Sequence, residues 1–88
     1  MIHIKYLITY DLNKPGQNYE DLYKAITETG SSYRHGMQNI WFVETSTTGK
    51  AIRDFLIQYI DTGDKLFVTR LNDWASYNLG NVADWLNS

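Results

Sequence analysis

Segments with the periodicity of a strand and segments with the periodicity of a helix follow one another along this chain. The order of these segments is the feature that most limits which fold the chain can adopt. In the first segment, residues 2–10, every second side chain from Ile4 to Tyr10 is apolar or aromatic, which is the two-residue period of a strand. Between residues 19 and 29, apolar side chains instead recur three and four positions apart, from Tyr19 to Ile26, as on one face of a helix. The chain therefore begins with a strand followed by a helix.

The remaining segments continue this alternation. Asn18 is predicted to cap the first helix and Gly30 to end it. Residues 31–37 are weakly strand-like and residues 38–43 strongly so, with a connection near residues 36–39. Ser46, Thr47 and Thr48 offer caps for a second helix, whose apolar positions run from residue 51 to residue 60. Residues 66–71 form the last predicted strand.

The resulting order, β-α-β-β-α-β, predicts an α+β fold. With right-handed crossovers it gives a four-stranded antiparallel sheet with both helices on one face, the ferredoxin-like arrangement. We expect one domain over residues 1–88, with a core at 2–71 and an extension at 72–88. The extension contains Trp74, Tyr77 and Trp85, and Asn81 is predicted to cap a short helix in it. Because two tryptophans are rarely left in solvent, this tail is expected to pack on its own domain or on a partner.

Composition narrows the class of protein. The 88 residues include no cysteine, so neither disulfides nor thiolate metal sites can stabilise the chain. The formal net charge of -2 argues against a protein that coats nucleic acid by bulk electrostatics. No run of 18 apolar residues suggests a membrane span, and the first residues do not resemble a signal peptide, so a cytoplasmic location is expected.

Small size and aromatic content together predict a homodimer. A chain of this length buries only about 60–65% of its unfolded surface and is marginal as a monomer. Aromatic residues make up 15% of the chain, and the predicted fold leaves one sheet face without helices. An apolar sheet face of this kind is a natural dimer surface.

Asp11 is the first candidate functional residue, because it follows the apolar strand directly. A carboxylate in this position is held by a rigid element and still reaches solvent, which suits a catalytic or metal-binding group. The simpler interpretation is a turn residue, since Asn13, Pro15 and Gly16 follow it.

With Tyr10 and Asp11 at the end of the first strand, a helix that ends near Gly30 and the run Gln38–Phe42 in the third strand, residues 4–71 resemble the Cas2 family of CRISPR-associated proteins and its Cas2-like relatives. The resemblance implies a homodimer whose sheets face each other. It also implies either a metal-dependent endoribonuclease or endodeoxyribonuclease, or a structural part of a DNA-capturing complex. Other Cas2-like proteins act in toxin–antitoxin systems.

The resemblance assigns Asp11 as both catalytic residue and metal ligand. Two such aspartates near a two-fold axis would hold one Mg²⁺ ion, which would activate water for attack on a phosphodiester. Gly36 and Ile40 stand where the family often carries arginine and serine.

Further candidate contacts to RNA or DNA are Tyr10, Asn13, Lys14, Arg34 and His35. The simpler alternatives are a sheet residue for Tyr10, an ordinary polar loop for Asn13 and Lys14, and a solvated pair for Arg34 and His35.

Two functions therefore remain open. One is a Cas2-like homodimer that acts on nucleic acid, with Mg²⁺ at Asp11. The other is a non-catalytic scaffold or regulatory module, of a phage or toxin–antitoxin type, that binds a protein partner through a sheet edge or the tail. The first function predicts that five residues gather on one side of the dimer, namely Lys5, Lys14, Lys24, Arg34 and His35. The second predicts an exposed aromatic tail or an unpaired strand edge.

Overall fold

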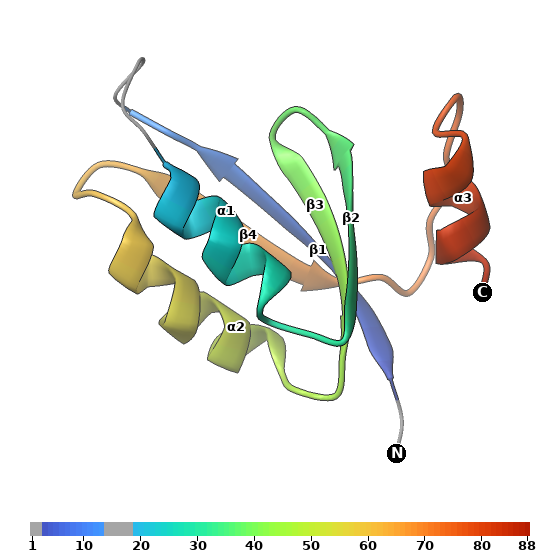
Figure 1. The fold of residues 1–88 in the computed structure, drawn as a ribbon, viewed down its shortest axis with the longest axis horizontal. Helices are drawn as coiled ribbons and strands as arrows, with labels where there is room; N and C mark the ends of the chain where they lie inside the picture. Colours follow the sequence, from blue (N-terminus) through green and yellow to red (C-terminus); the bar gives the residue numbers. More distant parts are fainter. Residues whose placement is uncertain (1–2, 14–18) are drawn as a thin grey trace.

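The computed structural model describes residues 3–13 and 19–88 of the chain (Figure 1). The elements are β1 (Ile4–Asp11), α1 (Glu20–Thr27), β2 (Ser32–Met37), β3 (Ile40–Thr45), α2 (Gly49–Leu56), β4 (Lys65–Arg70) and α3 (Asn81–Leu86). The four strands form one antiparallel sheet in the order β2-β3-β1-β4. The α+β, ferredoxin-like fold predicted from the sequence is therefore confirmed, and a short third helix follows it.

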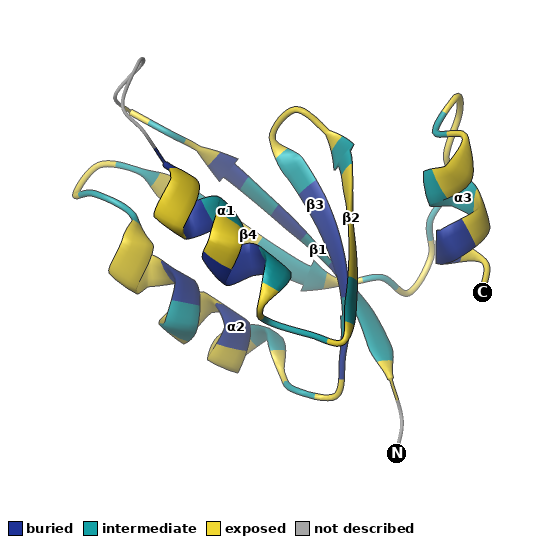
Figure 2. Ribbon diagram, in the orientation of Figure 1, coloured by how far each residue is buried: buried dark blue, intermediate teal, exposed yellow. Residues whose placement is uncertain are grey.

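The main core lies between the sheet and the first two helices. Alternate residues of β1, namely Tyr6, Ile8 and Tyr10, point toward α1 and α2 and are almost fully buried. Figure 2 shows buried residues on β1, on β3 and on parts of both helices, whereas the long outer surfaces of the helices are exposed. Burying these side chains is the main force that holds both helices on the sheet. From the helices, the fully buried side chains in this core are Leu22, Ile26, Ile52 and Leu56.

A second, smaller core lies on the opposite face of the sheet. There Phe42 of β3 packs with Trp85 and Leu86 of α3, and the partly buried Leu7 and Trp74 join them. Figure 1 shows α3 on the side of β2 and β3 away from α1 and α2. Of the two predicted alternatives for the tail, the structure shows packing on its own domain. The expectation that this sheet face is left uncovered is wrong for the part around β3, because the tail covers it.

Local signals explain where the helices begin. Thr48 caps α2, and its side-chain oxygen accepts a hydrogen bond of 3.1 Å from the backbone N–H of Ala51. Asn81 does not cap α3 as predicted, since it is the first helical residue and Gly80, with φ of 57°, occupies the cap position. Glycine suits that position because it has no side chain to oppose a positive φ. The predicted cap Asn18 lies outside the described residues.

The helices in the described part of the chain all fall short of the length and apolar character that crossing a membrane would require.

Candidate functional site

Asp11 is the last residue of β1, and its side chain is exposed. It pairs across the sheet with Lys65, the first residue of β4. Both residues line a shallow hollow of about 200 Å³ that also includes Thr9 and Phe67. A carboxylate, an ammonium group and an aromatic ring therefore lie together at one end of β1 and β4.

A magnesium site at Asp11 needs further oxygen ligands beside this carboxylate. No group of three or more His, Cys, Asp or Glu side chains that could hold a metal occurs in residues 3–13 and 19–88. The strand partner of Asp11 is Lys65, whose positive charge opposes a cation nearby. Within the described residues, one chain therefore offers Mg²⁺ the carboxylate of Asp11 without a cluster of further ligating side chains, and the rest of its octahedral shell would have to come from water, substrate or a second chain.

Tyr10 points away from Asp11, into the main core. Its ring is 6% exposed, and its hydroxyl accepts a 3.1 Å hydrogen bond from Trp41 Nε1. Burial raises the pKa of this hydroxyl above its ordinary value of 10.0, because the charged form would lose its hydration. The Tyr10 side chain thus anchors β1 to β3 and the helices.

Asn13 lies just beyond β1, and hydrogen bonds to Asp64 hold the chain in place there. The backbone N–H of Asn13 donates a 2.6 Å hydrogen bond to Asp64 Oδ1, and Asp64 Oδ2 accepts from the hydroxyl of Tyr19 at 3.2 Å and from the backbone of Asp61 at 2.8 Å. One carboxylate thus joins the end of β1, the start of α1 and the loop before β4. Lys14, the neighbouring candidate, lies outside the described residues.

Arg34 and His35 are adjacent in β2 and therefore point to opposite faces of the sheet. The His35 ring stacks on Trp41 with ring centres 4.0 Å apart and an interplanar angle of 4°. Arg34 lies on the tail side, where its guanidinium is 5.5 Å from the centre of the Trp85 ring. Both side chains contact indole rings of the same protein.

Among the described residues of the predicted site, Arg34 lies far from Asp11. Arg34 pairs with Phe42, which pairs in turn with Leu7, four residues before Asp11 in β1. At about 3.3 Å per residue this separates Arg34 from Asp11 by about 13 Å along the strand, in addition to two strand spacings across the sheet. Lys5 also lies on the tail side, 5.4 Å from the Trp85 ring centre. Lys5 and Arg34 of the predicted basic patch therefore share one face of the sheet, and His35 lies on the other face.

A different group of side chains surrounds β4, which is an edge of the sheet. Phe67 is 61% exposed and is shared by two hollows. One hollow contains Asp11 and Lys65, and the other, of about 280 Å³, contains Lys50 and Arg53 of α2. These five residues, Asp11, Lys50, Arg53, Lys65 and Phe67, are called the Phe67 edge below.

Asp54 moderates the charge of the Phe67 edge. Its carboxylate accepts a 2.8 Å hydrogen bond from Lys50 Nζ and bonds of 2.8 and 3.0 Å from the Arg53 guanidinium. The bond from Lys50 is the largest cause that lowers the pKa of Asp54 below its ordinary value, followed by that from Arg53. With Asp11 counted as well, three cations face two carboxylates, and the edge carries a small positive charge.

The sequence held one signal for this edge. Leu66 and Val68 flank Phe67 in a predicted strand, in which neighbouring side chains point to opposite faces. Phe67 therefore has to face away from any core that contains Leu66 and Val68. Lys50 and Arg53 lie 17 and 14 residues before Phe67 in the chain. Their approach to this edge depends on tertiary packing and has no local signal in the sequence.

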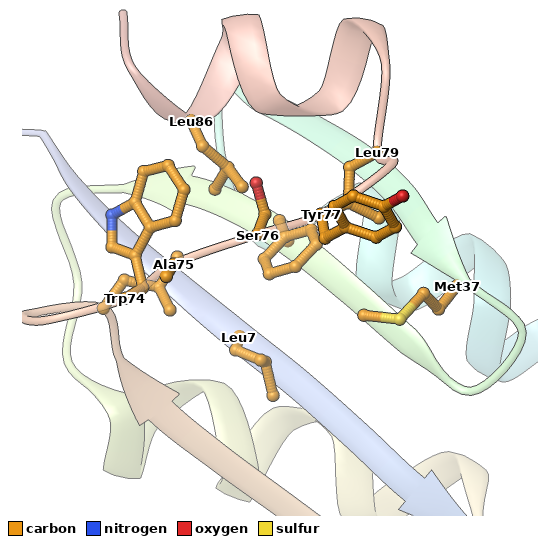
Figure 3. Close-up of a pocket in the computed structure, with 10 residues that line it drawn as sticks. Leu7, Met37, Trp74, Ala75, Ser76, Tyr77, Leu79 and Leu86 are labelled. Atoms are coloured by element: carbon orange, nitrogen blue, oxygen red, sulfur yellow. The ribbon is translucent and has the colours of Figure 1, made fainter.

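A pocket lies on the tail side of the sheet, and we call it the tail pocket (Figure 3). Its volume is about 250 Å³, and Met37 and Tyr77 line it although they are 46% and 91% exposed. Sequence reasoning missed this pocket, because it forms only where the irregular segment after β4 crosses the sheet. Its deeper walls come from Leu7, Phe42 and Leu71 beneath and from Trp74, Leu79 and Leu86 of the tail.

No protein-family model matches this chain. The structure supports the ferredoxin-like part of the resemblance to Cas2 proteins, and that fold is shared by proteins with many unrelated functions.

Proposed function

We propose that this protein is a Cas2-like, nucleic-acid-associated protein that holds a single-stranded segment along the Phe67 edge. The observation that carries the proposal is the position of Phe67, an exposed aromatic residue on an edge strand that lines one hollow with Lys65 and a second hollow with Lys50 and Arg53. Proteins that bind single strands combine aromatic rings, on which bases stack, with cations that contact the phosphates.

The ring of Phe67 supplies the stacking surface. A benzyl side chain that is 61% exposed on an edge strand gains little from packing in the free protein. Stacking one base on such a ring contributes about 1–3 kcal/mol and tolerates any base. A base on Phe67 would therefore provide affinity without sequence specificity.

The cations supply a limited number of phosphate contacts. Because Asp54 binds both Lys50 and Arg53, it offsets one of these two cations, so together they supply about one phosphate contact and Lys65 supplies a second. At about −0.7 per contact for a single strand, the slope of log K against log salt should be about −1.4. This small slope agrees with a chain whose net charge is -2.

A salt titration of binding tests the proposal. The affinity for a fluorescently labelled 12-nucleotide single strand would be measured by anisotropy between about 25 and 200 mM salt, with Mg²⁺ and with chelator. We expect a slope near −1.4 in the series with chelator, and Mg²⁺ should not strengthen binding, because the described residues of one chain form no cluster of metal-ligating side chains at Asp11. Absence of binding at low salt, or a slope of zero, would contradict the proposal.

A second candidate is a non-catalytic module that binds a protein strand, and the unpaired edge of β4 favours it. An extended segment of a partner, or of a second copy in the predicted homodimer, would add to β4 through backbone hydrogen bonds. Phe67→Leu separates the two functions, because leucine keeps an apolar side chain for strand addition but has no ring for base stacking. A partner strand should tolerate this change, and a nucleic acid should not.

A further inference from the structure

The tail pocket is a second feature of the surface and shares no residue with the Phe67 edge. In Figure 3, Leu7 lies beneath the pocket, Trp74 and Ala75 lie at one end, and Met37 and Tyr77 lie toward the other. Leu86 closes the pocket from α3, and Leu79 lies close to Tyr77. The pocket therefore lies between Leu7 of β1 and the tail, which are 65 or more residues apart in the chain.

Several interactions keep this pocket from collapsing. Trp85 donates a 2.8 Å hydrogen bond from Nε1 to Ser32 Oγ of β2, and Lys5 Nζ donates to the Ser88 backbone oxygen at 2.6 Å. Between Trp74 and α3, Asn78 and Gly80 both have positive φ, of 68° and 57°. Both hydrogen bonds hold the C-terminal end of the tail, and a 2.9 Å hydrogen bond from the backbone N–H of Leu71 to the backbone oxygen of Lys5 holds its start. The segment that crosses the sheet between these ends leaves the hollow open.

The volume of the pocket limits the size of a ligand. An apolar cavity of about 150 Å³ in another protein holds one benzene ring. The tail pocket, at about 250 Å³, is larger by more than half. A bicyclic ring system of naphthalene size is the ligand that fits this volume.

The chemistry of the walls limits the charge of a ligand. All ten residues that line the pocket are uncharged, and eight of them are apolar or aromatic without a hydroxyl. The only side-chain hydroxyls are those of Ser76 and Tyr77, two exposed residues. A charged group in this pocket would lose hydration without gaining a partner, whereas one neutral hydroxyl could bond at the mouth.

We infer that the tail pocket binds a neutral, bicyclic aromatic molecule whose single polar group lies near Ser76 and Tyr77. This binding site is independent of the proposed function, because it uses other residues. Most of the affinity comes from burial of the ring against Phe42, Leu71 and Trp74, and the hydroxyl sets the orientation.

The test uses 2-naphthol and 2-naphthoate, which have the same ring system but differ in charge at pH 7. Binding would be followed by the methyl resonances of Met37, Leu7, Leu71, Leu79 and Leu86 in ¹H–¹³C NMR spectra. We expect saturable shifts with 2-naphthol that are confined to these methyls, and at least tenfold weaker binding of 2-naphthoate. Shifts that spread over other methyls, equal affinities, or no saturable shift up to the solubility limit would overturn the inference.

Three variants locate the site. Ala75 is exposed and lines the pocket, so Ala75→Phe should occupy it and weaken 2-naphthol binding at least tenfold. Ala51→Phe places the same ring on α2, across the sheet, and should leave binding unchanged. Met37→Lys adds a cation at the rim and should raise the affinity for 2-naphthoate severalfold. If Ala75→Phe binds like the natural protein, or if Met37→Lys does not change the preference, the ligand does not occupy the tail pocket.

Discussion

The guanidinium of Arg34 lies 5.5 Å from the centre of the Trp85 ring, 51 residues later in the chain. Lys5 Nζ lies 5.4 Å from the same ring centre. Cations at this distance from an indole ring are attracted to its electron-rich face. Two of the cations that sequence reasoning offered to nucleic acid therefore hold the tail on the sheet.

Trp85→Ala should detach the tail. The substitution removes a side chain that is 8% exposed, its hydrogen bond to Ser32 and both cation contacts. Truncation of a buried tryptophan costs about 3–5 kcal/mol, and we expect a loss of about 3 kcal/mol in urea unfolding. Amide exchange of α3 should become fast while β1 stays protected. Tyr77→Ala, at a 91% exposed position, is the control and should change stability by less than about 0.5 kcal/mol.

Gly30→Ala should destabilise the connection between α1 and β2. A β-carbon at Gly30 would collide with the backbone carbonyl of Glu44, which also accepts a 2.9 Å hydrogen bond from the N–H of Ser31. Because backbone cannot move aside as a side chain can, we expect a loss of about 1–3 kcal/mol. Gly49→Ala is the matched variant, since its β-carbon would lie 3.5 Å from the Tyr6 ring, an ordinary contact. It should be neutral or stabilise by about 0.4–1 kcal/mol, and equal losses in the two variants would contradict this account.

Tyr10 should titrate above its ordinary pKa of 10.0, since its burial disfavours the charged form. The Tyr10 hydroxyl therefore loses its proton at a lower pH in the unfolded chain than in the folded protein. Its contribution to stability is therefore complete below about pH 10 and is lost as the pH rises through the pKa of the folded state. The ¹³Cζ resonance of Tyr10 reports this titration directly, and a midpoint at or below 10.0 would show that the hydroxyl is not buried as described. Tyr10→Phe should remove this part of the alkaline loss of stability.

Asp11→Asn tests the role that the resemblance to Cas2 proteins assigns to this carboxylate. Removing a negative charge beside Lys65 should tighten binding of a single strand about twofold, with no dependence on Mg²⁺. The assay compares both proteins on single-stranded RNA and double-stranded DNA, with Mg²⁺ and with chelator. Metal-dependent cleavage that disappears in Asp11→Asn would instead establish Asp11 as a catalytic metal ligand, completed by a second chain.

Most of the fold was predictable from periodicity, because the burial of β1, α1, β3 and α2 largely follows their apolar patterns. The position of the tail was not, because Trp74 and Trp85 show that the segment must be buried but not against which surface. The tail is placed on the helix-free face by the hydrogen bond from Trp85 to Ser32 and by the packing of Leu86 with Phe42, which only the folded structure shows.

The candidate site was predicted less well, partly for a reason visible in the sequence. Neighbouring residues of a strand face opposite sides, so Tyr10 and Asp11, like Arg34 and His35, could not share one surface. Strand alternation alone is consistent with Asp11 as a candidate site residue and places the Tyr10 side chain on the opposite face of the sheet. The union of Asp11, Lys65 and Phe67 requires the register between β1 and β4, which only the folded structure supplies.

The central claim is that Phe67 stacks on a base, and the most direct test is the affinity of Phe67→Leu for a single-stranded 12-mer. Because Phe67 is exposed, the variant should fold with nearly unchanged stability. The account predicts that binding weakens by about tenfold, which is the loss of about 1.4 kcal/mol of stacking, while the salt slope stays near −1.4. Unchanged affinity in Phe67→Leu would show that the ring does not stack on a base and would contradict the proposed function.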